Sequence, residues 1–343
     1  MTVSKLRVLA LVHRHLIPPE TVEEGTDITS EAWRTEYDVI STLRGLGHEV
    51  QPLGVHDDLG EIRRLVTEWK PQIAFNLLEA FDDVTIFDQN VISYLELLKL
   101  SYTGCNPRGL LLARDKALSK KLLAYHRIAV PEFEVFRIGR TIRRPKRLEF
   151  PLIVKSLTQE ASIGISQASV VDSDEKLKER VTFIHESIGT AALAERYIDG
   201  RELYVGILGN QTLQALPVWE LFFTNMPDGA KRIATDRVKW SVKYQKKYGI
   251  DSGPARDLAD ARSEQLQHLC KRAYRALELS GYARIDLRLD EAGNPWVIEA
   301  NPNPQIAKGE DFAASAEKAG FTYETVLQRI LNLGLRWQPE SAA

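Results

Sequence analysis

Apolar runs alternate with amphipathic stretches over the first hundred residues of the chain. Runs typical of strands cover 6–12, 48–53 and 72–78, and stretches with helical spacing of apolar residues cover 31–46 and 59–69. Strands that are each followed by a single helix form a parallel sheet with helices on both faces. The pattern therefore predicts an N-terminal α/β lobe built on a doubly wound parallel sheet.

This first lobe lacks the glycine-rich loop that binds dinucleotides. His13-Arg14-His15 follows the first predicted strand, where a G-x-G-x-x-G pattern would have to stand. The lobe is therefore not predicted to bind a dinucleotide.

The remainder of the chain predicts mixed α+β structure. A turn at Thr103-Gly104 leads into one helix that ends before Pro131. Residues 150–209 predict short strands around a helix near 174–186, with the strands at 151–155, 164–169, 191–197 and 202–208. Beyond them we expect strands near 212–223, a helix over 258–279, a hairpin over 282–301 and two closing helices.

A long polar stretch at 224–254 interrupts this third section. Compact domains seldom contain so long a segment without regular structure unless it has a function. A cluster of four lysines in its second half, Lys239, Lys243, Lys246 and Lys247, suits a segment that meets an anionic ligand. We expect a lid that closes over a bound substrate.

These patterns divide the chain into three lobes and a tail. The N-terminal α/β lobe is expected to bind substrate and to cover 1–112. The central lobe is expected at 113–205, the C-terminal lobe with the hairpin at 206–335, and the tail at 336–343.

Composition then excludes several functional classes. Hydrophobic residues make up 44% of the 343 residues, yet no apolar run reaches the eighteen or so that a membrane span needs. A net charge of −2 gives no basic surface for nucleic acid. Cys105 and Cys270 lie far apart and outside any C-x-x-C pattern, which argues against disulfides and thiolate metal sites. The N-terminus shows no signal-peptide pattern, so we expect a cytoplasmic protein.

The predicted hairpin carries the most informative polar residues. Arg284, Asp286, Arg288 and Asp290 share one face of its first strand because they alternate with period two. If 291–294 form the loop, Asp290 faces Pro295. The same register sets Arg284 opposite Asn301 and Asp286 opposite Glu299.

Two carboxylates that face each other across a hairpin repel, so the pair needs a compensating charge. In one interpretation Arg284 and Arg288 neutralise Asp286 and Glu299 on a solvated sheet face. In the other, Asp286, Glu299 and Asn301 form an oxygen cluster for Mg²⁺, which takes a few carboxylates and shares its shell with substrate phosphates. Mn²⁺ is a second hard cation that suits the same ligands.

The hairpin resembles that of D-alanine–D-alanine ligases and other ATP-grasp enzymes, whose pattern is Arg-x-Asp followed by Glu-x-Asn. The resemblance extends from about residue 75 to 333. It rests on six further landmarks: Phe75-Asn76, Tyr102-Thr103-Gly104, Asp115-Lys116 with Lys120, the strand 151–155 ending in Lys155, the small-residue loop 161–166, and Glu195 with Glu202. It implies an ATP-grasp fold behind the N-terminal lobe.

The resemblance also implies roles for single residues in binding ATP. Glu195 would receive the adenine amino group, the backbone at Arg196 and Ile198 would frame the ring, and Glu202 would hold the ribose. The phosphates would meet Lys116, Lys155 and Ser162 of the small-residue loop. Lys243 with Tyr244 would be the lid pair, and Arg284 would stabilise the tetrahedral intermediate.

Three departures from the family pattern concern the substrates. Glu160 stands in the phosphate loop where the family usually has glycine, and Glu79-Ala80 replaces a His-Gly turn. The C-terminal loop has Lys308 and Glu310 where the family has a serine-rich stretch. A carboxylate facing a substrate carboxylate costs about 4 kcal/mol at 4 Å and an effective dielectric near 20. We therefore expect that D-alanine dimerisation is not the main activity.

The leading hypothesis is an ATP-dependent carboxylate–amine ligase that forms an amide or peptide bond through an acyl phosphate. One alternative joins other amino acids or a specialised-metabolite precursor. Another, of a different class, is a nucleotide-binding regulatory protein without turnover. The expected partners are a small-molecule acid and amine, with no nucleic acid and no membrane, and a homodimer is compatible with the sequence.

Overall fold

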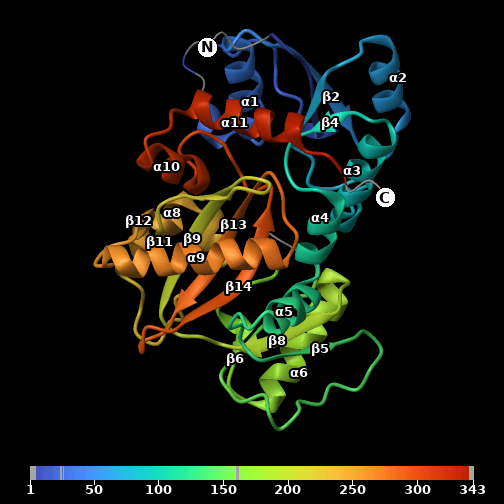
Figure 1. Ribbon diagram of the computed structural model, residues 1–343. Helices are drawn as coiled ribbons and strands as arrows, with labels where there is room; N and C mark the ends of the chain where they lie inside the picture. The colour runs from blue at the N-terminus through green and yellow to red at the C-terminus, as the bar shows by residue number, and fades with distance from the viewer. Residues whose placement is uncertain (1–4, 24, 26, 160–161, 340–343) are drawn as a thin grey trace.

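The computed structural model describes residues 5–23, 25, 27–159 and 162–339, which form three lobes (Figure 1). The N-terminal lobe contains a parallel sheet of order β2-β1-β3-β4. Its strands are β1 (Arg7–His13), β2 (Glu49–Val55), β3 (Ile73–Asn76) and β4 (Ser101–Tyr102). The predicted doubly wound parallel sheet is confirmed.

Helices cover both faces of this sheet, because successive residues of β1 point to opposite sides. Val8, Ala10 and Val12 pack with α1 (Arg34–Gly45) and α11 (Tyr323–Arg336). Leu9 and Leu11 belong to a second core cluster with α2 (Gly60–Glu68) and α3 (Asp88–Leu97). The last helix of the chain, red in Figure 1, therefore lies beside the blue α1 and completes the first lobe.

Two helices, rather than the single one expected, connect the first lobe to the second. They are α4 (Pro107–Arg114) and α5 (Lys116–Tyr125). Asp115 lies between them with an extended backbone, and its Oδ1 accepts hydrogen bonds from the N–H groups of Ala117 and Leu118. An Asp that caps the next helix in this way ends the preceding one.

The central lobe holds a small antiparallel sheet of order β5-β8-β6-β7. Its strands are β5 (Phe133–Phe136), β6 (Leu152–Ser156), β7 (Val170–Val171) and β8 (Ala192–Arg196). One helix packs on it, α6 (Asp174–Phe183), continued by a π-helical turn at Ile184–Ile188. The prediction of a strand at 164–169 is wrong, because a 3-10 turn at Gln167–Ser169, capped by Ser166, lies in that segment.

The C-terminal lobe is built on a larger antiparallel sheet of order β12-β11-β9-β13-β14, with β10 beside β9. Its strands are β9 (Arg201–Leu208), β10 (Gln214–Ala215), β11 (Trp219–Phe223), β12 (Ile250–Pro254), β13 (Tyr282–Leu289) and β14 (Pro295–Pro302). The helix α9 (Asp260–Ala276) crosses one face of this sheet, and α10 (Asp311–Lys318) follows β14 (Figure 1).

The polar stretch 224–254 is more regular than expected. It contains α7 (Asp236–Trp240) and α8 (Val242–Tyr248), and it ends in β12, which pairs with β11 along its whole length. Only the part before α7 lacks helix and strand. A mobile lid over the entire stretch is therefore excluded by β12, and the lid hypothesis is restricted to 224–248.

The expected lobe boundaries fall inside secondary structure. The boundary after 112 cuts α4, and the boundary after 205 cuts β9, which belongs to the C-terminal sheet. The predicted tail begins with the end of α11, and its residues 340–343 lie outside the described part of the chain. Within the described ranges, no helix combines the length and apolar character needed to cross a bilayer.

Candidate functional site: a cleft between the central and C-terminal lobes

A cleft opens between the central sheet and the hairpin β13–β14. Seven of its lining residues were predicted to bind nucleotide and two to bind metal. They are Lys116, Lys155, Ser162, Glu195, Arg196, Ile198 and Glu202, with Asp286 and Glu299. The apolar part of the lining includes Ile153, Ile198, Leu287 and Ile298. A largely apolar cleft with a few converging charges is typical of a small-molecule site.

The hairpin has the predicted register from Arg284 to Asp286. Arg284 lies opposite Asn301 and Asp286 opposite Glu299. Beyond Asp286 the register shifts by one residue, so that Leu289 rather than Asp290 faces Pro295. The predicted pairing of Asp290 is therefore wrong. The shift leaves Ile298 as an extra residue in β14, and its carbonyl accepts a hydrogen bond from Lys120 Nζ at 2.7 Å.

Arg284 compensates much of the repulsion between the two carboxylates. Its Nε and Nη2 donate to the two oxygens of Asp286 at 2.7 and 2.9 Å, a bidentate geometry. Asn301 Nδ2 donates to Asp286 Oδ2 at 2.9 Å. Asp286 is thus held from two sides, while the Arg284 guanidinium also lies over the ring of Tyr204 at 4.5 Å.

The two carboxylates differ in acidity. Burial raises the pKa of Asp286, and the charge of Glu299 adds to that effect against the opposing pull of Arg284. Burial also opposes ionisation of Glu299, but Lys155, Lys116 and Lys239 outweigh it and lower its pKa. Glu299 is therefore the permanent anion of the pair, and Asp286 is the one whose charge a bound cation would stabilise.

Buried lysines surround Glu195. Lys120 Nζ and Lys155 Nζ each lie 2.8 Å from one of its carboxylate oxygens, and all three side chains are almost fully buried. Burial disfavours charge on Lys120 and lowers its pKa. Burial has the same tendency at Lys155, but Glu195 and Glu299 outweigh it and raise that pKa. Lys116 Nζ donates to the Gln159 carbonyl at 2.7 Å.

Ser162 ties the small-residue loop to a neighbouring segment at the rim of the cleft. Ser162 has a positive φ of 63°, and its hydroxyl donates to the Ala234 carbonyl at 2.7 Å. This bond joins the small-residue loop to the segment before α7. Glu160 of that loop lies outside the described residues.

Arg288 is a lining residue that sequence reasoning had assigned only to charge neutralisation. Its Nη2 lies 2.6 Å from Glu202 Oε2, the carboxylate expected at the ribose. Arg196 lines the cleft as well, and its guanidinium lies over the ring of Trp296 at 4.7 Å.

The structure brings Lys239 of α7, rather than Lys243, into the lining of the cleft. Lys243 and Tyr244 lie on α8, and neither is a lining residue. Lys239 and Lys243 lie on two different helices, and the assignment of Lys243 with Tyr244 to the lid stays a prediction. Lysines recur at 239, 243, 246 and 247, so a residue pattern alone could not choose among them.

The three expected substrate residues lie away from the cleft lining, toward the first lobe. Arg34 Nη1 lies 2.9 Å from Glu310 Oε1, and the Lys308 backbone N–H donates to Asp38 Oδ2 at 2.9 Å. Glu79 follows β3, and its charge contributes to a raised pKa of about 7 at Glu36, after the larger effect of burial. The Glu310 carboxylate is therefore neutralised by Arg34, which sequence reasoning missed.

The chain is similar to known proteins over most of its length. The family model described as D-ala D-ala ligase C-terminus matches residues 122–332. The chain is 34% identical over 245 residues to a D-alanine–D-alanine ligase of Bordetella petrii, covering 69% of each protein. It is 30% identical over 298 residues to one of Desulforudis audaxviator, covering 86% of this chain and 90% of that protein.

Solved structures show the same fold. A crystal structure of the D-alanine–D-alanine ligase from Bacillus anthracis in complex with ATP superposes with a TM-score of 0.72 at 22% identity. The match covers 96% of this chain and 98% of the other. An enzyme of this name from Coxiella burnetii gives a TM-score of 0.71 at 16% identity.

Proposed function

This chain belongs to the D-alanine–D-alanine ligase family and is an ATP-dependent carbon–nitrogen ligase of ATP-grasp fold, and we propose that the cleft described above is its ATP site. The single observation that carries the proposal is the convergence of Lys116, Lys155 and Lys239 with Asp286 and Glu299 in one cleft. Transfer of a phosphoryl group needs cations and positioning more than covalent chemistry from the protein.

The oxygen cluster of the hairpin fits a hard divalent cation. Asp286 and Glu299 face each other, and the Asn301 amide lies beside Asp286. Asp286, Glu299 and Asn301 would hold Mg²⁺, or Mn²⁺, whose charge would neutralise phosphate oxygens of the bound nucleotide. The raised pKa of Asp286 supports this assignment, since burial and the charge of Glu299 outweigh Arg284 there, and a bound divalent cation would offset both.

The proposed reaction has two steps. A carboxylate oxygen of the acid attacks the γ-phosphorus of ATP, so that an acyl phosphate forms and ADP leaves. The amine nitrogen of the second substrate then attacks the acyl carbon, phosphate leaves with the bonding electrons, and the nitrogen loses a proton. Arg284, fixed by Asp286, would stabilise the negative charge of the tetrahedral intermediate.

The remaining lining residues would bind the nucleotide. Lys116, Lys155 and Lys239 would contact phosphates, with Ser162 at the loop beside them. Glu195 would meet the adenine amino group, between the backbone of Arg196 and that of Ile198, and Glu202 would hold the ribose hydroxyls. Arg288 would orient Glu202, to which it is already hydrogen-bonded.

We keep the prediction that D-alanine alone is not the preferred substrate, although the relatives compared above are named for it. The argument now rests on Glu79, whose charge acts on the buried Glu36, more than on Glu310, which Arg34 neutralises. Two carboxylates near the first lobe favour a substrate with an ammonium group and disfavour a free carboxylate there. Action in the cytoplasm, where ATP is supplied, and a homodimer are further expectations.

ADP release tests the proposal directly. We expect the purified protein with Mg²⁺ and ATP to release ADP only when an acid and an amine are both supplied, and faster with mixed amino acids than with D-alanine alone. Nucleotide binding without ADP release from any pair would make the protein a nucleotide-binding regulator. D-alanyl-D-alanine as the sole product would leave the ligase in place and overturn the substrate prediction.

A further inference from the structure

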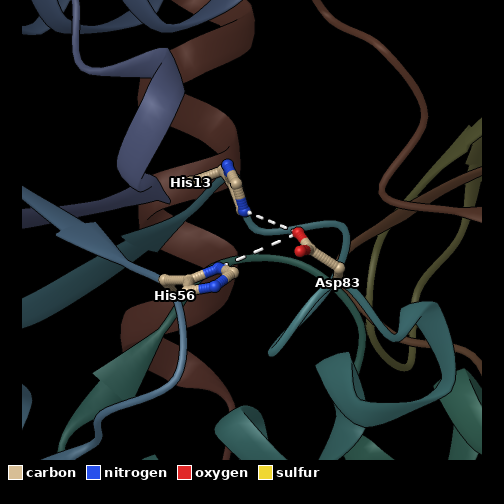
Figure 2. Close-up of side chains that lie close together, drawn as sticks. All are labelled: His13, His56 and Asp83. Carbon is tan, nitrogen blue, oxygen red and sulfur yellow. Dashed lines mark ion pairs between the residues drawn. The ribbon is translucent and has the colours of Figure 1, made fainter.

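Two histidines and an aspartate converge in the N-terminal lobe, outside the nucleotide cleft. His13 ends β1, His56 follows β2, and Asp83 lies in the loop after β3 (Figure 2). Neighbouring strands of a parallel sheet end at the same edge, which brings these three segments together. His13 is the residue that replaces the glycine-rich loop of dinucleotide-binding lobes.

The distances within this cluster are longer than those of ordinary hydrogen bonds and suit a shared ion. Asp83 Oδ1 lies 3.5 Å from His13 Nε2 and 3.8 Å from His56 Nδ1. All three ligand atoms lie within 4.8 Å of one another. Two ligands on a tetrahedral zinc ion, each about 2.0–2.1 Å from it, are separated by about 3.4 Å.

The two imidazoles already present the required nitrogens. His56 Nδ1 is buried, and among the described residues it has no hydrogen-bond partner. A buried polar atom without a partner calls for a ligand, an ion or a water molecule. His13 Nε2 lies 3.5 Å from Asp83 Oδ1, and it binds a metal when the imidazole proton is on Nδ1, which requires loss of the weak contact at 3.5 Å between Nδ1 and the His15 backbone N–H.

The backbone of the aspartate loop is held in place for this arrangement. Asp82 and Asp83 have φ values of 52° and 56°, a conformation that non-glycine residues seldom adopt twice in succession. The Asp82 backbone N–H donates to the His56 carbonyl at 2.7 Å, which fixes the loop against the end of β2. Asp82 and Asp83 are the two central residues of a tight turn closed by backbone hydrogen bonds between Phe81 and Val84, and this turn places Asp83 beside the two histidines.

We propose that His13, His56 and Asp83 bind a divalent transition metal ion of the zinc class, with water in the fourth position. Two imidazoles and one carboxylate select such an ion over Mg²⁺, which prefers oxygen ligands alone. The chain would then carry two chemically distinct metal sites. The ion would fasten the loop 79–84, and with it Glu79, to the carboxyl ends of β1 and β2.

Titration with Zn²⁺ in saturating Mg²⁺ tests this site, because Mg²⁺ occupies the oxygen cluster of the hairpin. Calorimetry should show one Zn²⁺ per chain, and Zn²⁺ should raise the melting temperature. His13→Asn and His56→Asn should weaken binding by about a hundredfold or more, because a metal with one ligand fewer is held far less tightly. His126→Asn, at an exposed histidine after α5, should bind as wild type.

Asp83→Asn keeps the test independent of folding, because the Asp83 side chain is 76% exposed and its loss leaves the core intact. This variant should melt as wild type without zinc and lose most of the zinc-dependent shift. Co²⁺ should give the visible absorption of a tetrahedral site in wild type and not in His56→Asn. Hydrogen exchange of residues 79–84 should slow when zinc is added.

The proposal is overturned if wild type shows no saturable Zn²⁺ binding in Mg²⁺, or if His56→Asn and Asp83→Asn bind as tightly as wild type. Unchanged hydrogen exchange of 79–84 with zinc bound would overturn the fastening of the loop.

Discussion

Buried carboxylates have different neighbours in the nucleotide cleft and at the substrate end of the N-terminal lobe. In the cleft, two buried carboxylates have cations at hydrogen-bond distance: Glu195 has Lys120 and Lys155, and Asp286 has Arg284. In the first lobe, Glu36 is buried near the charge of Glu79, and its Oε2 has no hydrogen-bond partner among the described residues. Glu195 and Asp286 thus have charged partners before a ligand binds, whereas the charged group that acts on the pKa of Glu36 is a second carboxylate.

This difference separates the residues that we expect to bind ATP from those that we expect to select the substrates. ATP presents the same charges to every ligase of this fold, so one set of lysines and carboxylates serves them all. The acid and amine differ between enzymes, and the residues that receive them differ accordingly. We expect the residues that select the substrates in the first lobe, and six substitutions test the contrast between the two regions.

The largest effect is expected for Asp286→Asn. Turnover should fall by about a thousandfold or more, as for the loss of charge stabilisation in a closed site. The buried Arg284 would also lose its bidentate partner, at a cost of about 3–5 kcal/mol in the free energy of unfolding. Chemical denaturation without Mg²⁺ measures this cost.

Glu299→Gln is the matched control for Asp286→Asn. It should abolish turnover equally but leave the Arg284–Asp286 pair intact, so its stability should remain closer to that of wild type. If both variants unfold alike, the cleft carboxylates stabilise the fold rather than bind a cation.

The second effect concerns Glu36 in the first lobe, whose pKa is raised to about 7 by burial and by Glu79. The folded state holds this proton more tightly than the unfolded chain, where the pKa is 4.5. Stability from this group is therefore present below pH 4.5 and is lost as the pH rises toward 7. The loss amounts to about 3 kcal/mol, since one pKa unit is about 1.4 kcal/mol.

Glu36→Gln removes this proton equilibrium and isolates its effect. The free energy of unfolding of the variant should equal that of wild type near pH 4.5 and exceed it at pH 8. Unfolding in urea at both pH values measures this effect. If the free energy of unfolding changes with pH in the same way for both proteins, Glu36 is ionised in the folded state and its pKa is not raised. A stability gain would also show that the carboxylate is retained for a substrate rather than for folding.

The third effect distinguishes two lysines on adjacent helices. Lys239 lines the cleft and contributes to the lowered pKa of Glu299, whereas Lys243 does neither. Lys239→Met should lower kcat/KM for ATP by about a hundredfold, and Lys243→Met by less than about twofold. The reverse ranking would restore the assignment made from sequence. Protease mapping of 224–248 with and without a non-hydrolysable ATP analogue tests ordering of this segment through Lys239.

Local periodicity and turn length were enough to predict that Arg284 pairs with Asn301 and Asp286 with Glu299. They could not predict the bulge at Ile298, because that extra residue is stabilised by distant partners: Lys120 donates to its carbonyl, and Val297 N–H donates to the Ala129 carbonyl. The break at Asp115 had a readable signal, since an Asp before a new helical pattern is a good cap.

The cluster of His13, His56 and Asp83 was within reach of sequence reasoning. Its residues end or follow three successive predicted parallel strands, whose carboxyl ends meet at one edge. The pairing of Arg34 with Glu310 was not within reach. The two residues lie 276 positions apart, and α10 and α11 return to the first lobe only in the folded chain.

The smallest effect is expected for Glu310→Gln, where the two regions meet. Arg34 keeps its hydrogen bond to the Lys308 carbonyl, and the Glu310 side chain is 36% exposed, so the free energy of unfolding should fall by less than about 1 kcal/mol. The KM for ATP should not change, because Glu310 does not line the cleft. If acidic residues exclude a substrate carboxylate, removing this charge should lower the KM for D-alanine by about two- to fivefold and raise it for an amine without a carboxylate. Steady-state kinetics with both acceptors measures these KM values. Equal changes in KM for the two acceptors would mean that Glu310 only holds Arg34. A change in the KM for ATP would mean that the two regions are coupled.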